Sequence, residues 1–367
     1  MPITIQGLLK EVHALNGSDL HLVAGLPPMA RVAGEMTPLQ HPPLDAQALR
    51  EILDPTMTDE HRKTLKAEQR ANYSYAIAGQ GRYRFNVCQS LGSYSATIRL
   101  LLASIPPLAN LGLPAVVATL TERRAGIVLV TGSTGSGKST TLAAMLQHVN
   151  LHGRPSKIVT IEDPIENLIP NGPPGRSVIM QREVGFDTPS FEDGLMDSLR
   201  QDPDIICVGE MRTPKSIMAA LLAAETGHLV LTTLHTKDAA KSAQRIITAV
   251  SLEAQESLRE QLAMTLDAVI SQQLLPRSDR KGLVLVADIL IATPATRQLV
   301  RENRLEQIND AILSGGHVGM VSKDAWLAKL FEKRIVSKET ATANMRNPSL
   351  LGSAATQAAP ALTQNAF

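Results

Sequence analysis

The stretch Gly132-Ser133-Thr134-Gly135-Ser136-Gly137-Lys138-Ser139 fits the pattern G-x-x-x-x-G-K-[ST] at every fixed position. An apolar run from Ile127 to Thr131 precedes it and predicts a buried strand, and residues Thr140 to Val149 predict a helix after it. Glycines let successive backbone N–H groups turn inward around phosphate oxygens, and a helix N-terminus adds partial positive charge. The stretch therefore predicts a phosphate-binding loop (P-loop) rather than an ordinary glycine-rich turn.

The residues of this loop have distinct predicted roles. Lys138 is expected to reach the β- and γ-phosphates of ATP, and the Ser139 hydroxyl is expected to be a ligand of Mg²⁺. ATP and Mg²⁺ are therefore the expected cofactors. The predicted nucleotide contacts are Ser133, Thr134, Gly135, Ser136, Gly137, Lys138, Ser139 and Thr140.

A carboxylate and two histidines adjoin further apolar strands. Glu210 follows the run from Ile205 to Val208, at the strand end that adjoins the P-loop in a doubly wound sheet. There it would hold Mg²⁺ or polarise the attacking water, unless it is only a surface acid. His228 and His235 flank the strand Leu229 to Leu234 and are candidates for sensing the γ-phosphate, although an isolated histidine is more often structural.

Three more carboxylates follow the strand Ile158 to Ile161, in Thr160-Ile161-Glu162-Asp163-Pro164-Ile165-Glu166. One of them is a candidate general base for activating water. On these residues alone, a solvated acidic loop is the simpler alternative.

Residues 1–100 predict a smaller α/β domain whose predicted strands carry Arg82, Arg84 and Arg99. Strand alternation places Arg82 and Arg84 on one face. Arginine suits phosphate because its guanidinium is a planar fork, although ordinary surface charges explain these residues equally well. The predicted helices are 5–15, 46–53 and 59–68, and the predicted strands are 19–23, 29–32, 73–77, 82–87 and 96–101.

The rest of the chain predicts a linker, a second domain and a tail. Ile105-Pro106-Pro107 can continue neither a helix nor a strand, so 101–122 is the expected linker. Strands followed by helices over 123–346 predict a mostly parallel sheet, with a long helix over Gln255 to Leu275. Residues 347–367 predict a disordered tail.

Composition excludes several classes of protein. The net charge of +1 and the 3% of aromatic residues argue against a nucleic-acid-binding protein. No apolar run is long enough for a transmembrane segment, and the N-terminus does not resemble a signal peptide. The two cysteines, Cys88 and Cys207, form no CxxC pair, so neither a zinc module nor a disulfide framework is expected. These features predict a cytoplasmic protein.

Four motifs in order give a more specific resemblance. TIEDPIE (160–166), QREVGFDT (181–188), DPDIICVGEMR (202–212) and AAETGHLVLTTLHT (223–236) resemble the secretion-ATPase superfamily, specifically type IV pilus retraction ATPases of the PilT kind. GSDLHLVAGLPP (17–28) resembles the opening of that family's PAS-like N-terminal domain. The resemblance covers residues 1–346 and implies a RecA-like P-loop core after the PAS-like domain.

The resemblance also implies roles and partners. Its members are hexamers that dock on an inner-membrane platform protein and remove pilin from the fibre base, the step behind twitching motility. It therefore implies a homohexamer, peripheral to the inner membrane, with a paralogous retraction ATPase as a further partner. The implied catalytic residues are Glu166 as base, Glu210 as the Walker B glutamate, the His-box pair His228 and His235, and the nucleotide-facing Arg82 and Arg99.

Departures from the family pattern leave the paralogue open. The C-terminal retraction motif AIRNLIRE reads ATRQLVRE here, so Thr296 replaces an isoleucine, which predicts a weakened apolar contact. Leu91 stands where many members carry arginine, and the tail is longer, as in the accessory paralogue PilU. Two other classes stay open: an ATP-gated binding module with little turnover, and a DNA translocase. Extension ATPases resemble the chain less, because they usually carry a four-cysteine zinc module.

Overall fold

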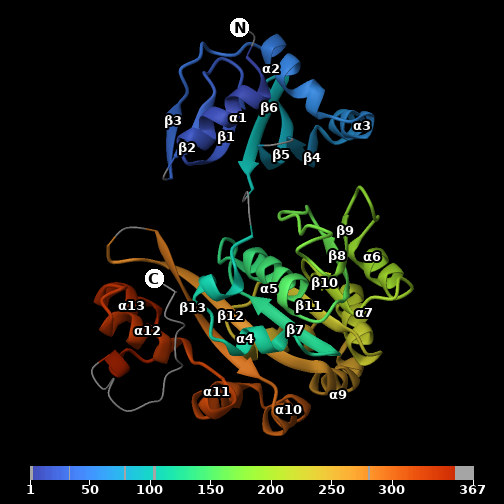
Figure 1. The fold of residues 1–367 in the computed structure, drawn as a ribbon, viewed down its shortest axis with the longest axis vertical. Helices are drawn as coiled ribbons and strands as arrows, with labels where there is room; N and C mark the ends of the chain where they lie inside the picture. Colours follow the sequence, from blue (N-terminus) through green and yellow to red (C-terminus); the bar gives the residue numbers. More distant parts are fainter. Residues whose placement is uncertain (1–2, 33, 78–79, 102–104, 280–281, 352–367) are drawn as a thin grey trace. The chain divides into compact units, whose positions relative to one another are not determined.

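The computed structural model describes residues 3–32, 34–77, 80–101, 105–279 and 282–351 (Figure 1). Contacts divide the chain into two compact units, residues 1–104 with 164–167 and residues 105–163 with 168–367. Each unit has its own apolar core. The domain limits expected from the sequence, at 100, 122 and 346, stay predictions.

The N-terminal unit contains a six-stranded antiparallel sheet with the order β3-β2-β1-β6-β5-β4. Strand β3 was not anticipated from the sequence, whereas the other five strands overlap the predicted ones. The strands are β1 Gly17–Val23, β2 Met29–Val32, β3 Glu35–Pro38, β4 Arg70–Ile77, β5 Gly81–Ser90 and β6 Ser93–Leu100, and the helices are α1 Ile5–Ala14, α2 Ala46–Leu53 and α3 Asp59–Glu68.

The two faces of this sheet differ in polarity. On one face, Leu20, Ile98, Phe85 and Tyr73 occupy matching positions on four neighbouring strands and are all buried. The next row along the strands points to the opposite face and is charged, with Arg31, Asp19, Arg99 and Arg84 at matching positions. Alternation along the strands therefore separates an apolar core face from a polar face.

Helices α2 and α3 begin and end at the residues predicted from the sequence, and their N-caps explain why they begin there. The Asp45 carboxylate accepts a hydrogen bond from Ala48 N at 2.8 Å, and Thr58 forms a capping box with His61. Both caps satisfy backbone donors that the first helical turn leaves without partners.

The second unit contains a seven-stranded sheet with the order β13-β12-β7-β11-β10-β8-β9, parallel except for β13. All six residues of β7 are buried, which agrees with the apolar run read from the sequence. The strands are β7 Gly126–Thr131, β8 Lys157–Glu162, β9 Val178–Glu183, β10 Ile205–Val208, β11 Leu229–Leu234, β12 Leu266–Pro276 and β13 Leu283–Ile291.

Ten α-helices accompany this sheet in the described residues, and α11 and α12 lie beside β13 (Figure 1). None of the described helices combines the length and the apolar character that crossing a bilayer requires. The helices are α4 Val116–Leu120, α5 Lys138–His152, α6 Phe191–Ser198, α7 Pro214–Glu225, α8 Ala239–Ile247, α9 Gln255–Thr265, α10 Pro294–Arg301, α11 Ile308–Ser314, α12 Lys323–Glu332 and α13 Lys338–Asn344.

The long helix predicted over Gln255 to Leu275 is wrong. Helix α9 ends at Thr265, and the chain continues directly as strand β12. Leu258, Leu262 and Leu266 have helical spacing, but β12 lies between β7 and β13 and is buried on both faces along much of its length. In such a strand, apolar residues can face either side, so the period-2 alternation is lost and periodicity does not distinguish it from a helix.

Part of the expected linker packs in the core of the second unit. Leu108, Leu113, Val117 and Leu120 are all buried there, in a short 3₁₀ turn, the segment after it and helix α4. Residues 102–104 of the expected linker and 352–367 of the expected tail lie outside the described residues.

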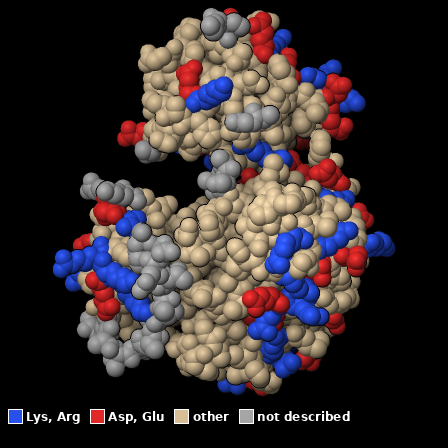
Figure 2. Space-filling view, viewed as in Figure 1, with Lys and Arg blue, Asp and Glu red and all other residues tan. Residues whose placement is uncertain are grey.

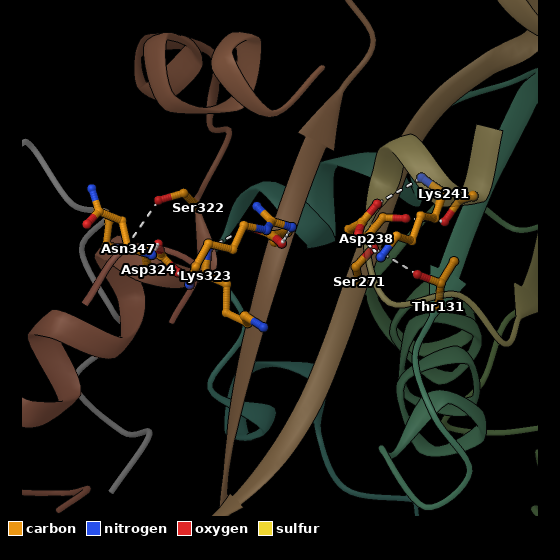
Figure 3. Close-up of polar contacts among 12 residues, drawn as sticks. Thr131, Asp238, Lys241, Ser271, Ser322, Lys323, Asp324 and Asn347 are labelled. Carbon is orange, nitrogen blue, oxygen red and sulfur yellow. Dashed lines mark hydrogen bonds and ion pairs between the residues drawn. The ribbon is translucent and has the colours of Figure 1, made fainter. Parts of the chain in front are cut away.

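Buried carboxylates tie the C-terminal segment to the sheet (Figure 3). Asp288 of β13 is 1% exposed and accepts hydrogen bonds from Arg346 Nη2 and Lys323 N, both at 2.6 Å. Asp324 accepts from the backbone N–H groups of Arg346 and Asn347 at 2.9 and 2.8 Å. Burial raises the pKa of Asp288, and the Arg346 charge opposes that rise.

The structure gives Thr296 a role that the sequence did not suggest. Its side chain is buried, and its hydroxyl forms the third position of a capping box with Thr293 at the start of α10. Thr293 N donates to Thr296 Oγ1 at 2.7 Å. The buried Thr296 hydroxyl therefore has a hydrogen-bond partner at the N-terminus of its own helix.

Charged side chains of both signs are interspersed on the face of the molecule drawn in Figure 2. This distribution agrees with the net charge of +1.

Candidate functional site

The P-loop lies between the buried strand β7 and helix α5, as predicted. Gly132 has φ +147°, and a Cβ there would lie 2.3 Å from the Gln272 carbonyl oxygen. Gly137 has φ +85° and immediately precedes α5. Only glycine fits both the conformation and the close approach at Gly132, which explains the fixed glycine in the motif.

Lys138 is the first residue of α5, and its side chain folds back over the loop. Its Nζ donates to the carbonyl oxygens of Gly132 and Ser133, each at 3.0 Å, and the residue is only 8% exposed. The ammonium group is thus already held at the loop, where phosphate oxygens would offer it stronger, charged acceptors.

The site fits a nucleoside triphosphate with Mg²⁺. Ser136 Oγ is buried and has no hydrogen-bond partner within the part of the chain that the structure describes. Ser139 is an exposed residue on the first turn of α5. The described residues assemble no cluster of three or more His, Cys, Asp or Glu side chains that could hold a metal ion.

Glu210 and His235 meet at the end of the sheet where the P-loop lies. Oε2 of Glu210 lies 3.2 Å from Nε2 of His235, and the other carboxylate oxygen pairs with Arg212. The Glu210 side chain is 13% exposed. Since β10 and β11 are parallel neighbours, residues that follow them come together at the carboxyl ends of these strands.

Two backbone contacts connect this acid–histidine pair to the fold. Gly132 N donates to the Leu234 carbonyl at 3.3 Å, so the P-loop directly adjoins the end of β11 that precedes His235. Thr233 Oγ1 donates to Gly209 O at 2.6 Å beside Glu210. The structure therefore gathers the P-loop, Glu210 and His235, which the sequence placed together only by analogy with doubly wound sheets.

His228 lies at the opposite end of the parallel strands from His235. It precedes β11, and its Nδ1 lies 3.0 Å from the Ala223 carbonyl and 3.2 Å from Thr226 Oγ1. A six-residue strand separates it from His235, which corresponds to about 20 Å. Within one chain, the two histidines therefore do not share a site, and the catalytic role of His228 stays a prediction.

The carboxylates after β8 differ in their surroundings. Glu162 Oε1 accepts from Thr160 Oγ1 at 2.6 Å and from Gln181 Nε2 at 3.0 Å, so Glu162 ties β8 to β9. Glu166 belongs to the segment 164–167, which the contacts group with the N-terminal unit. Its role as catalytic base stays a prediction.

Arg82 and Arg99 both lie on the polar face of the N-terminal sheet. Arg99 Nε donates to Asp19 Oδ1 at 2.9 Å, and its side chain is 61% exposed. Burial alone would raise the pKa of Asp19, but hydrogen bonds from Ser18 and Arg99 and the Arg99 charge hold it below its ordinary value. The nucleotide-facing roles of these arginines stay predictions.

Sequence reasoning missed two residues of this region. Arg212 ends the same motif as Glu210, and its position two residues after the acid was the available signal. Gln272 lies on β12 against the P-loop, within a segment misread as a helix, so its alignment with the loop was not visible.

Comparison with known proteins identifies the family. The family model described as "Type II/IV secretion system protein" matches residues 109–315. The chain belongs to this family.

Relatives in this secretion ATPase family match over nearly the whole chain. The type IV pilus retraction ATPase PilT of Pseudomonas aeruginosa (strain PAO1) is 40% identical over 331 residues, covering 90% of this chain and 95% of the relative. The type IV pilus ATPase PilU of the same organism is 33% identical over 337 residues, covering 92% and 87%. A crystal structure of the pilus retraction motor PilT with bound ADP has 39% identity and a TM-score of 0.88, covering 96% and 99%.

These comparisons confirm the predicted family and fold class, a P-loop ATPase with a mostly parallel sheet after a smaller N-terminal domain. The N-terminal sheet is entirely antiparallel.

Proposed function

We propose that this chain is an ATPase motor that hydrolyses ATP to power retraction of a type IV pilus. The observation that carries the proposal is the assembly of the P-loop, Glu210 and His235 at the carboxyl ends of the parallel strands. The chain that contains them is 40% identical to PilT over nine-tenths of its length. Hydrolysis of ATP to ADP and phosphate needs positioning and charge neutralisation more than covalent chemistry, and these groups supply both.

Each residue then has a defined task. The P-loop backbone and Lys138 bind and orient the phosphates. Mg²⁺, held by Ser139 and Glu210, would neutralise charge on the β- and γ-phosphates. Glu166 accepts the proton of the attacking water. His235 fixes the Glu210 carboxylate through the 3.2 Å contact between them.

The remaining predicted residues act in an assembled ring. His228, Arg82 and Arg99 would then complete nucleotide sites at subunit boundaries of a homohexamer. A ring closes when one heterologous contact repeats around an axis. We further propose that the hexamer works in the cytoplasm, at the inner-membrane face of the pilus base, docked on the platform protein. Light scattering of the purified chain with ATP tests this; a monomer at micromolar concentration would contradict it.

The decisive experiment is a count of surface pili, with twitching motility, in a strain that lacks this gene. We expect excess pili and lost motility, both restored by the wild-type chain and by neither Lys138→Ala nor Glu166→Gln. Fewer pili would instead indicate an extension motor. Unchanged pili would contradict a role as the principal retraction motor.

An accessory retraction ATPase is the second candidate. The chain is 33% identical to PilU over 92% of its length, against 40% identity to PilT, so relatedness to the accessory ATPase also spans nearly the whole chain. Production in a strain that lacks every other retraction ATPase separates the two functions. A principal motor restores retraction there alone, whereas an accessory motor requires its paralogue.

A further inference from the structure

Gln272 is a buried polar residue in the sheet of the second unit. It lies on β12, which pairs with the P-loop strand β7 on one side and with β13 on the other. The residue is only 3% exposed. A buried amide is costly unless its donor and its acceptor both find partners, so its contacts indicate why it is there.

Both ends of the Gln272 amide contact the P-loop and its helix. Nε2 donates to the Ser136 carbonyl at 2.7 Å, and Oε1 accepts from the Thr141 hydroxyl at 3.0 Å. Thr141 lies within the first turn of α5 and is 1% exposed. The Ser136 carbonyl can only accept, so the amide must present its N–H group to Ser136, and the Thr141 hydroxyl then donates to Oε1.

Gln272 also approaches both flanking glycines of the loop. A Cβ at Gly132 would lie 2.3 Å from the Gln272 carbonyl oxygen, and one at Gly137 would lie 3.3 Å from Nε2. The P-loop therefore contacts or closely approaches this one residue at Gly132, Ser136 and Gly137.

We propose that Gln272 is a positioning residue that holds the P-loop in its phosphate-binding conformation. The peptide between Ser136 and Gly137 is planar and trans, so its C=O and N–H groups point in opposite directions. Holding the Ser136 carbonyl toward β12 directs the Gly137 N–H away from the sheet, ready for a phosphate oxygen. This inference rests on the proposed nucleotide site and adds a residue outside the motif to it.

Loss of the amide leaves the Ser136 carbonyl buried without its donor and lets the peptide rotate. We expect Gln272→Met, which has similar length and no donor, to weaken binding of a fluorescent ADP analogue about ten-fold. The matched control is Gln273→Met. Gln273 is the next residue, and its amide donates to Asn344 Oδ1 in α13 at 2.8 Å instead of to the loop. We expect its Kd to stay within two-fold of wild type.

Gln272→Glu tests the proposal through the pH dependence of ADP affinity, which a purely structural role of Gln272 would leave unchanged. Its protonated carboxyl can donate to the Ser136 carbonyl, whereas its carboxylate cannot. Relative to wild type at each pH, its ADP affinity should therefore recover as the pH falls, and that of Gln272→Met should not. This comparison remains informative if Gln272→Met folds poorly.

The outcomes separate this inference from the proposed function. Wild-type protein that binds no ADP analogue would contradict the ATPase assignment itself. Wild-type protein that binds, with Gln272→Met no weaker than Gln273→Met, overturns only the role of Gln272. A pH-independent Gln272→Glu defect would likewise overturn it.

Discussion

Nε2 of His235 lies 3.2 Å from Oε2 of Glu210, across the ends of two neighbouring parallel strands. Arg212 pairs with the other oxygen of the same carboxylate. Both carboxylate oxygens are thus engaged by groups that follow β10 and β11. Groups of the fold itself therefore orient the carboxylate, which lowers the cost of arranging it during the reaction.

Glu210→Gln should lower kcat about 100-fold, because the neutral amide cannot supply the charge that the metal and the attacking water require. The Kd of an ADP analogue should change less than three-fold, since the P-loop is untouched. Steady-state ATPase assays and fluorescence titrations measure both. Glu339→Gln, at an exposed carboxylate in α13, is the control. Normal turnover by Glu210→Gln would contradict the assignment.

Arg346→Met should lower the free energy of unfolding at pH 8 by about 2 kcal/mol, because it leaves the buried Asp288 carboxylate without its cation. Burial already raises the pKa of Asp288 above its ordinary value, and loss of Arg346 removes the charge that opposes this rise. A raised acid pKa means that the folded state binds the proton more tightly. The deficit should therefore shrink as the pH falls towards that raised pKa.

Urea denaturation of Arg346→Met at several pH values between 5 and 8 measures this dependence. Asp288→Asn in the same background removes the titrating group and should abolish the extra pH dependence. A deficit of equal size at every pH would show that the loss does not come from Asp288.

Thr296→Val should destabilise the protein by about 1 kcal/mol, although it makes a buried position more apolar. The hydroxyl accepts from Thr293 N, and valine cannot replace that bond. Thr296→Ser keeps the hydroxyl and should lose less in the same urea titration. Equal or greater stability of the valine variant would favour the original expectation of a disturbed apolar contact.

Leu91→Asn should stabilise the protein by about 0.5 kcal/mol. Leu91 has φ +52° in the tight turn between β5 and β6 and is fully exposed, so it has strain without packing. Asparagine tolerates this conformation better than leucine. Leu91→Val should have the opposite effect, because β-branching increases the strain. Thermal or urea unfolding of the two variants should bracket wild type.

The sequence predicted helices, strands and loops best where a short local pattern was enough to identify them. The predicted bounds of α2 and α3 agree with the structure to the residue, and continuous apolar runs gave β10 and β11 to the residue. The P-loop was predicted in full, because its glycines, lysine and serine have fixed spacing between a strand and a helix. These features are local, so no knowledge of packing is needed.

The missed features depend on contacts between distant segments. The boundary between α9 and β12 depends on pairing with β7, more than 130 residues earlier in the chain. The role of Gln272 depends on the same pairing, since Ser136 is 136 residues away. Neither a period nor a motif encodes such an alignment, and the capping role of Thr296 was hidden because its substitution was judged by polarity alone.

The two apolar cores share no member among the described residues. Substitutions at distant sites without common partners alter stability nearly additively. Natural variation can therefore accumulate in one core without compensating changes in the other. In the half that contains the P-loop, such variation stops at Gly132, because a Cβ there would lie 2.3 Å from the Gln272 carbonyl oxygen.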